Sequence, residues 1–235
     1  MISSTPAPRR PSSLTERRKA ATRMEIARAA ARLFVTQGLR ATRAEDIAQA
    51  AGIAPRTFYR YFATKEEAVA PLYAAGAQRW TDAVRAAPAE LSVPEALAHA
   101  VRHTLTPGAG VSAASWQWVR TLISLAGNSP AVRKVWAEVC QDSERALAQV
   151  LTSRAGTEDN VADASAHDRA SDAATPLTPE LRFTAAVASA AVRVAVEAWA
   201  TGEAAADGPQ GPAALALRNL AALRDFTWEA GGHRS

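Results

Sequence analysis

Cysteine is almost absent from this chain of 235 residues, which has only Cys140. A single cysteine excludes a disulfide within the chain and fits a reducing compartment, although secreted proteins without disulfides also exist. Long apolar runs are lacking as well, because the longest, from Ala185, is interrupted by Arg193 and Glu197. The N-terminus has no apolar run that could serve as a signal peptide. Together these absences predict a soluble protein of the cytoplasm that does not enter a membrane.

Residues that favour β-sheet are few. Aromatic residues make up 6% of the chain, and alanine is far commoner than valine, isoleucine, phenylalanine or tyrosine. Alanine has the highest intrinsic helix propensity, so the composition favours helix over sheet. A chain of this length with 48% hydrophobic residues can bury a large core in one or two compact units. We therefore predict an all-α protein.

Motifs for catalysis, metals and cofactors are also missing. The "PGAG" segment at Gly108 has neither the length nor the lysine of a phosphate-binding loop. His99 and His103 are four residues apart, but further soft ligands such as Cys140 and His167 are distant in the sequence, so we favour an ordinary helix pair over a zinc site. We expect no cofactor and no metal. A helical enzyme of amide or thioester chemistry remains an alternative, and it would require a reactive cysteine or histidine pair.

Positive charge is concentrated at one end of the chain. Residues 1–65 carry 13 Lys and Arg against 4 Asp and Glu, a net charge of +9, whereas residues 66–235 carry a net charge of −5. Such an asymmetry indicates a polyanionic partner for the basic part, either nucleic acid or an anionic membrane. Residues 1–13 are rich in proline, serine and arginine, and we predict a disordered basic arm there.

Three helices are predicted after the arm. An apolar stripe runs along about residues 15–37, and Gly38 ends that helix. Thr42 and Glu45 have the spacing of a capping box, which opens a short helix that ends at Gly52. A third helix covers about residues 55–61, with a proline in its first turn. The second and third helices are joined by "AGIA" and form a helix-turn-helix.

The third helix has two different faces. Phe58 and Phe62 are four residues apart, so they share one face and are predicted to pack on the second helix. Arg56 and Arg60 are also four apart, with Tyr59 beside them on the side away from Phe58. Guanidinium and phenol groups donate to phosphates and base edges, so this face is suited to the major groove of DNA. Binding to RNA or to an anionic membrane is the alternative.

The stretch "ATRAEDIAQAAGIAPRTFYRYFATKEE", preceded by "AARLFVTQGLRATR", resembles the DNA-binding domain of the tetracycline-repressor (TetR) family. The resemblance covers about residues 15–70 and implies an all-α homodimer that binds a DNA operator. One departure is Ala54, where the family usually has a Ser or Thr cap. The resemblance implies DNA contacts from phosphate-binding and groove-facing residues: Thr42, Arg43, Pro55, Arg56, Thr57, Tyr59, Arg60, Tyr61 and Lys65.

The remaining residues, 66–235, are predicted to form a larger helical domain, after a DNA-binding domain at 14–65. A helix from Lys65 to about Ala86 has Pro71 inside it, which predicts a kink. Ser92 and Glu95 form a capping box, and residues 154–177 have no helical period and are read as a flexible loop. The other helices are expected at about residues 92–105, 112–126, 129–153, 178–201 and 213–228.

The helix at 178–201 has apolar residues on two stripes, so both must be covered. One stripe suits the core of the chain and the other a second copy, which makes the last two helices a candidate dimer interface; a central helix within a monomer is the alternative. The first stripe is Phe183, Val187, Ala190, Val194 and Ala198; the second is Ala185, Ala188, Val192, Val196 and Trp199.

All six tryptophans lie beyond residue 72, and a pocket among the helices from 65 to 201 is the expected site of a small apolar effector. The predicted effector residues are Trp80, His103, Trp116, Arg120 and Trp136, with Arg120 or Arg133 holding an acidic group of the effector. The run "NSPAVRKVW…LTSR…TPELRFTAAVASAAVRVAVEAWATG" is similar to the TetR branch that includes the mycofactocin-system regulator and senses acyl-CoA-like ligands.

Overall fold

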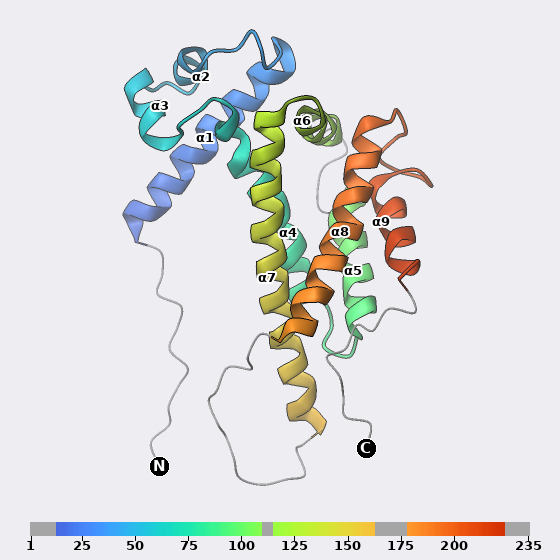
Figure 1. Ribbon diagram of the computed structural model, residues 1–235. Coiled ribbons are helices and arrows are strands. Elements are labelled where there is room, and N and C mark those ends of the chain that lie inside the picture. Colours follow the sequence, from blue (N-terminus) through green and yellow to red (C-terminus); the bar gives the residue numbers. More distant parts are fainter. Residues whose placement is uncertain (1–12, 110–114, 163–177, 224–235) are drawn as a thin grey trace, which may run out of the picture. The chain divides into compact units, whose positions relative to one another are not determined.

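A computed structural model describes residues 13–109, 115–162 and 178–223, and every regular element in those residues is helical (Figure 1). The all-α prediction is confirmed. The chain divides into two compact units, Met1–Leu72 and Tyr73–Ser235. The division falls seven residues beyond the predicted end of the DNA-binding domain at residue 65, because the short helix η1 (Glu66–Val69) packs on the first helix of unit 1.

Unit 1 begins with α1 (Leu14–Thr36), close to its predicted range. The Ser13 hydroxyl accepts a hydrogen bond from the Glu16 N–H at 3.2 Å and so caps the first turn. Gly38 follows the helix with φ of +86°, a conformation that L side chains rarely adopt, and the chain turns there. The predicted apolar stripe is buried at Ile26, Ala30 and Phe34.

The start of α2 (Ala44–Ala50) differs from the prediction. The Asp46 carboxylate accepts from the Arg43 N–H at 2.8 Å, so the cap lies one residue after the predicted Thr42–Glu45 box. Thr42 is fully buried, and its hydroxyl donates to the Gly38 carbonyl at 2.9 Å. A buried hydroxyl requires a partner, and the nearby carbonyl supplies it, so the hydroxyl is not available to cap a helix.

The predicted helix from Lys65 to Ala86 is two elements. Thr64 accepts from the Glu67 N–H at 3.2 Å and opens the 3₁₀ helix η1, after which α4 runs from Ala70 to Ala86. Pro71 therefore lies in the first turn of α4, where its missing N–H has no intrahelical role. The prediction of a proline inside a continuous, kinked helix is wrong, because the chain begins a new helix at the position that proline tolerates.

Unit 2 holds α5 (Val93–Leu105), α6 (Trp116–Asn128), α7 (Pro130–Ala162), α8 (Pro179–Thr201) and α9 (Pro212–Ala221), in addition to most of α4. The Ser92–Glu95 capping box is confirmed, and the Thr178 hydroxyl caps α8 by accepting from the Leu181 N–H at 3.3 Å. The helix α7 continues nine residues beyond its predicted end, so residues 154–162 are helical and not part of a loop. The remainder of the predicted loop, the start of the predicted sixth helix, and Trp228 lie outside the described residues.

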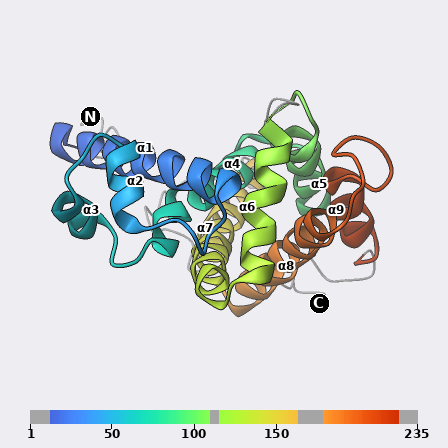
Figure 2. The same ribbon diagram turned by 90° about the horizontal axis from the view of Figure 1, so that it is seen from above.

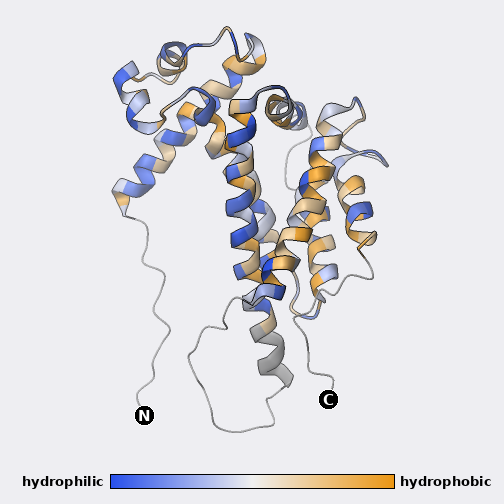
Figure 3. Cartoon of the chain, in the orientation of Figure 1, coloured by the Kyte–Doolittle hydropathy of each residue, from blue (hydrophilic) through white to orange (hydrophobic). Residues whose placement is uncertain are grey.

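The packing of unit 2 centres on α8. It contacts α6, α7 and α9, and α9 lies on the side of α8 away from α7 (Figure 2). Figure 3 shows α8 as predominantly hydrophobic, and by length and composition alone it is apolar enough to cross a membrane, a test that core helices of soluble proteins also pass. The core of unit 2 includes Trp80, Leu97, Leu147, Leu151 and Ala188.

Candidate nucleic-acid interface and pocket

The turn between α2 and α3 (Pro55–Tyr61) depends on Gly52, which has φ of +68°. The Ile53 N–H donates to the Ala48 carbonyl at 2.9 Å and fixes the reversal of the chain. Phe58 is fully buried and Phe62 is 3% exposed, with their ring centroids 5.7 Å apart. The predicted core face of α3 is therefore confirmed, and it holds α3 against α2.

The opposite side of α3 is exposed. We define the recognition face as those residues of α3, together with the residue before α2, that were predicted to contact DNA and that are exposed or half-buried in the structure. Tyr59 is 52% exposed, although it is a large aromatic residue of a kind that folded proteins usually bury at least in part. The recognition face comprises Arg43, Pro55, Arg56, Tyr59 and Arg60, which are exposed, and Thr57 and Tyr61, which are half-buried.

Tyr59 has a partner that sequence reasoning missed. Its hydroxyl donates to the Glu45 carboxylate on α2 at 3.2 Å. Desolvation raises the pKa of the Tyr59 phenol, and the charge of Glu45 raises it further. The phenol therefore stays protonated and keeps a hydrogen to donate. The residues are 14 apart in the chain, and only the packing of α2 on α3 brings them together.

Two residues that were predicted to contact DNA make hydrogen bonds within unit 1. Thr42 is fully buried, so its hydroxyl cannot reach a phosphate, and that prediction is corrected. The Lys65 ammonium donates to the carbonyls of Leu39 and Thr42 at 2.7 and 2.8 Å. An ammonium has three hydrogens, so one remains for another acceptor. Lys65 thus holds the loop between α1 and α2 in addition to any contact outside the domain.

Arg23 is a further residue that sequence reasoning missed. Its guanidinium donates to the Tyr61 carbonyl at the end of α3 at 2.8 Å and lies 4.5 Å from the centre of the Phe62 ring. A cation near the last carbonyls of a helix stabilises that end, and the ring adds a cation–π contact. At the other end of α3, Ala54 makes no side-chain cap, as its residue type predicts. Arg23 therefore fixes one end of α3.

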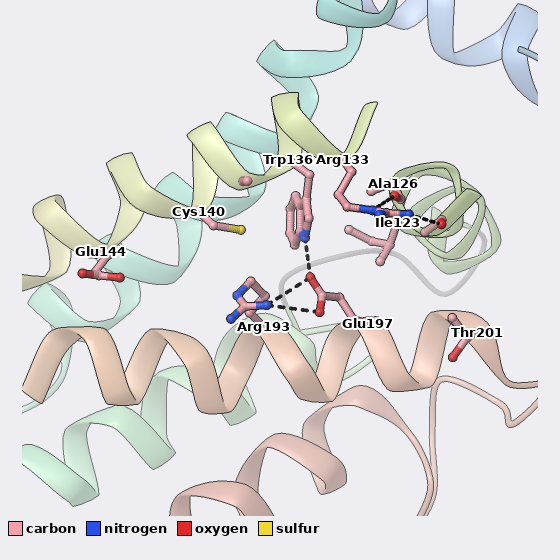
Figure 4. Close-up of a pocket in the computed structure, with 11 residues that line it drawn as sticks. Ile123, Ala126, Arg133, Trp136, Cys140, Glu144, Arg193, Glu197 and Thr201 are labelled. Atoms are coloured by element: carbon pink, nitrogen blue, oxygen red, sulfur yellow. Dashed lines mark hydrogen bonds and ion pairs between the residues drawn. The ribbon is translucent and has the colours of Figure 1, made fainter. Parts of the chain in front are cut away.

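A pocket of about 670 Å³ lies between α6, α7 and α8 (Figure 4). We call it the α6–α8 pocket. Its apolar wall is formed by Ile123, Ala126, Ala137 and the Trp136 ring, and its polar groups come mainly from α7 and α8. It is lined by Ile123, Ala126, Gly127, Arg133, Trp136, Ala137, Cys140, Glu144, Arg193, Glu197 and Thr201.

A hydrogen-bonded group spans the pocket from α7 to α8. The Trp136 indole N–H donates to the Glu197 carboxylate at 2.6 Å, and the Arg193 guanidinium approaches the same carboxylate at 3.3 Å (Figure 4). On its other side the Trp136 ring packs edge-on against Tyr73 of α4, with centroids 5.1 Å apart. Tyr73 is 4% exposed and donates to the Leu122 carbonyl at 2.5 Å. The pocket wall is thus in contact with α4.

The structure does not bring the predicted effector residues together. Of those five, only Trp136 lines the α6–α8 pocket. Trp80 is buried in the core of unit 2, and His103 is exposed on α5. Trp116 packs edge-on against Trp199, and the Arg120 guanidinium lies 4.4 Å from the centre of the Trp199 ring. Trp116, Arg120 and Trp199 thus pack on one another instead of lining the pocket, which their spacing in the sequence could not reveal.

Arg133 lines the pocket, as its predicted role requires, but its guanidinium caps α6. It donates to the carbonyls of Ala126 and Gly127 at 3.3 and 2.8 Å. Arg120 donates to the Ala204 carbonyl and is not among the pocket residues. Both arginines that were predicted to hold the acidic group therefore make other contacts. The structure places another arginine, Arg193 on α8, in the pocket lining, a residue that the sequence analysis noted only as an interruption of an apolar run.

Comparison with known protein families finds a match for the N-terminal helices. Residues 26–70 match the model of the bacterial regulatory proteins of the tetR family. This segment covers the end of α1, the helix-turn-helix, and η1. The match supports a TetR-family domain at residues 26–70. The resemblance stated from the sequence is confirmed for this domain, whereas the similarity of the C-terminal run to the mycofactocin-system branch is not confirmed.

Relatives of the TetR family share the rest of the fold. The transcriptional regulator TcmR of Streptomyces glaucescens is 27% identical over 147 residues, which are 62% of this chain and 65% of TcmR. The chain thus spans about two thirds of that relative. Thermus thermophilus FadR, solved with lauroyl-CoA, has a TM-score of 0.50 at 21% identity and covers 91% of this chain and 98% of its own. A TetR-family regulator of Rhodococcus sp. gives 0.51 at 17% identity, with 86% and 98% covered.

TetR-family proteins are transcription regulators and not enzymes, which confirms the prediction that this chain is not an enzyme. The alternative required a reactive Cys140. Burial raises the pKa of the Cys140 thiol to about 12; the nearby Arg193 opposes the rise and Glu197 adds to it. A thiol is nucleophilic only as the thiolate, so Cys140 is a poor nucleophile at neutral pH.

We expect the alkylation rate of Cys140 by iodoacetamide to rise about tenfold per pH unit from pH 8 to 10 without a plateau, because the thiolate fraction grows tenfold per unit below the pKa. The chain unfolded in denaturant is the control, and its rate should level off above its ordinary pKa of about 8.5. Rapid alkylation of the folded protein at pH 7.5, with a plateau below pH 10, would contradict the burial of this thiol.

Proposed function

We propose that this protein is a sequence-specific DNA-binding regulator of transcription that represses its target genes. The observation that supports it best is the recognition face, where Arg56, Tyr59 and Arg60 are exposed while Phe58 and Phe62 beneath them are buried. A rigid helix with outward guanidinium groups is suited to the major groove, where arginine reads guanine through two hydrogen bonds. The net charge of +9 on residues 1–65 attracts phosphate.

We assign the remaining residues of the recognition face to the same interface. Arg43 supplies a phosphate contact at the start of α2, and Pro55 and Thr57 approach the groove. Tyr61 and the third hydrogen of Lys65 clamp the backbone, while Thr42 is left out because it is buried. Residues 1–12 of the predicted arm lie outside the described residues, and we propose that Arg9 and Arg10 add affinity there without changing the preferred site.

We further propose that the protein is a homodimer and binds a palindromic operator. The second stripe of α8 is largely buried in unit 2, whereas Phe183 and Val194 of the first stripe are 59% and 49% exposed. Exposed apolar residues on a core helix mark an association surface, and a twofold dimer is the commonest arrangement. The helices α8 and α9 of two copies would form this interface. Dimers of this kind read two half-sites about one helical turn apart.

The α6–α8 pocket is the proposed site of a small effector that releases the operator. Its volume of about 670 Å³ suits a small molecule. Trp136 links the pocket to Tyr73 of α4, and α4 begins in unit 1 at Ala70. An effector bound against Trp136 would therefore act through Tyr73 on α4, which joins the DNA-binding unit to the rest. An acyl-CoA-like effector is a finer suggestion, supported by the lauroyl-CoA bound to Thermus thermophilus FadR. The protein would act in the cytoplasm.

Selection of bound sites from a random DNA pool with purified protein tests this function. We expect a palindrome, bound about 10³-fold or more tightly than random DNA at physiological salt. Calorimetric titration of an effector found by screening should then give weaker binding in the presence of that operator, because coupling between two ligands is reciprocal. Weak sequence preference would indicate an architectural DNA-binding protein instead, and equal effector affinity with and without operator would remove the regulatory role of the pocket.

A further inference from the structure

Arg193 on α8 has hydrogen-bonding capacity that the pocket leaves available. A guanidinium carries five N–H donors in a planar fork. The structure shows Arg193 using one nitrogen, Nη1, for the Glu197 carboxylate, at 3.3 and 3.5 Å. Within the described part of the chain, no residue accepts a hydrogen bond from its Nε or Nη2. These two nitrogens form the edge of a guanidinium that binds carboxylates with two parallel bonds.

Two of the other charged residues of the pocket, Arg133 and Glu197, are engaged in a different way. The Arg133 guanidinium is bound to two carbonyls at the end of α6. The Glu197 carboxylate already accepts from Trp136 and faces Arg193, so a cationic ligand would compete with a guanidinium on the same helix. An anion meets no such competitor at Nε and Nη2 of Arg193. The Arg193 side of the pocket therefore favours an acid over a base, while Glu144, the remaining charged residue of the lining, lies on α7.

The rest of the pocket is apolar on one side. Ile123 and Ala126 of α6 and the Trp136 ring of α7 form a wall opposite α8 (Figure 4). The Trp136 ring is held in place by its bond to Glu197 and by Tyr73 behind it, so it offers a fixed flat surface. Flat apolar groups can stack on such a ring in an offset or edge-to-face arrangement.

We propose that the α6–α8 pocket binds an apolar acid, with the acidic group on Nε and Nη2 of Arg193 and the apolar body against Trp136. This inference rests on the proposed function of the pocket as the effector site, and it names the chemical class of the effector. Carboxylate, sulfonate and phosphate groups share the required geometry of two acceptor oxygens. A lysine at this position would offer a single point charge without the fork.

Two fluorescent probes test this proposal in the full-length protein without DNA. One is 8-anilinonaphthalene-1-sulfonate, and the other is N-phenyl-1-naphthylamine, which has the same rings without the sulfonate. We expect the sulfonate to bind the unmodified protein more tightly than the neutral amine. Arg193→Gln should weaken sulfonate binding by about 10- to 100-fold, the range for lost charge-assisted hydrogen bonds, and leave amine binding unchanged.

Matched variants separate charge from geometry. Arg193→Lys should restore only part of the sulfonate affinity, because it keeps the charge without the fork. Arg145→Gln, which removes an exposed arginine of α7 outside the pocket, should have no effect on either probe. Loss of sulfonate affinity to the same extent in Arg145→Gln would overturn the proposal, since it would show a general effect of net charge.

The proposal fails if Arg193→Gln binds the sulfonate as tightly as the unmodified protein does. If that variant does not fold, the unmodified protein alone decides, because equal or tighter binding of the neutral amine would also overturn the proposal. Neither measurement involves DNA. Failure of the regulatory function, seen as effector affinity that operator does not change, is therefore distinguishable from failure of the acid-binding assignment.

Discussion

Replacing Arg60 with alanine is expected to weaken binding to the selected operator by about 1–3 kcal/mol, the loss typical of a two-bond contact between arginine and a base. Arg60 is exposed on α3, and its guanidinium lies 5.6 Å from the centre of the Tyr61 ring, which orients it without burying it. Removing it leaves the core residues Phe58 and Phe62 in place. Binding to random DNA should fall much less than binding to the operator, so specificity should decrease. Gel-shift titrations with both DNAs measure this difference.

Arg145→Ala is the charge-matched control, because Arg145 is exposed on α7 in unit 2 and pairs with Asp142. It should change neither affinity nor specificity. Arg43→Ala gives a second contrast, because Arg43 is exposed and loss of a phosphate contact weakens all sequences alike and reduces the salt slope by about one unit. Operator affinity that is unchanged in a folded Arg60→Ala variant would remove this residue from the interface.

Phe58→Ala should have the largest effect on stability, about 3–5 kcal/mol, as expected for deleting a fully buried aromatic ring. Phe58 is 0% exposed and contacts both the Phe62 and the Tyr59 rings, with centroids 5.7 and 5.5 Å away. The cavity would lie between α2 and α3, so the helix-turn-helix should unfold while unit 2 stays folded. DNA binding should be lost together with that unit.

The distribution of tryptophan allows the two units to be followed separately in the full chain. All six tryptophans belong to unit 2, whereas both units contribute to the helical circular dichroism signal. During urea unfolding, Phe58→Ala should move part of the dichroism transition to lower denaturant and leave the tryptophan fluorescence transition in place. Arg60→Ala, at an exposed position on the same helix, is the control and should shift neither. A shift of the fluorescence transition in Phe58→Ala would contradict the independence of unit 2.

Local signals account for what the sequence predicted well. The helix-turn-helix depends on residues within a few positions of one another, such as the glycine at 52 and the phenylalanines at 58 and 62, so their spacing is sufficient. The Ser92–Glu95 cap is local in the same way. The predictions of the all-α fold and of the core face of α3 rest on these patterns and were confirmed.

Contacts between distant residues account for what the sequence did not predict. Arg23 is 38 residues from Tyr61, and Trp136 is 61 residues from Glu197, so no periodicity relates them. The shifted cap at α2 has a similar origin, because the burial of Thr42 follows from the packing of unit 1. The pocket was expected among the tryptophans in general, but five of the six have other positions in the fold or lie outside the described residues.

The junction of η1 and α4 limits the kind of motion that could pass between the two units. A 3₁₀ helix rises about 2.0 Å per residue and an α-helix about 1.5 Å, so rewinding the four residues of η1 into α4 would shorten the chain by about 2 Å and turn it by about 80°. Such rewinding would place Pro71 four residues after Glu67 in a continuous α-helix, where its ring clashes with that carbonyl and no N–H is available. Pro71 therefore prevents η1 from rewinding into a continuous α-helix with α4. A rotation that requires η1 to rewind as part of α4 is therefore excluded at this link.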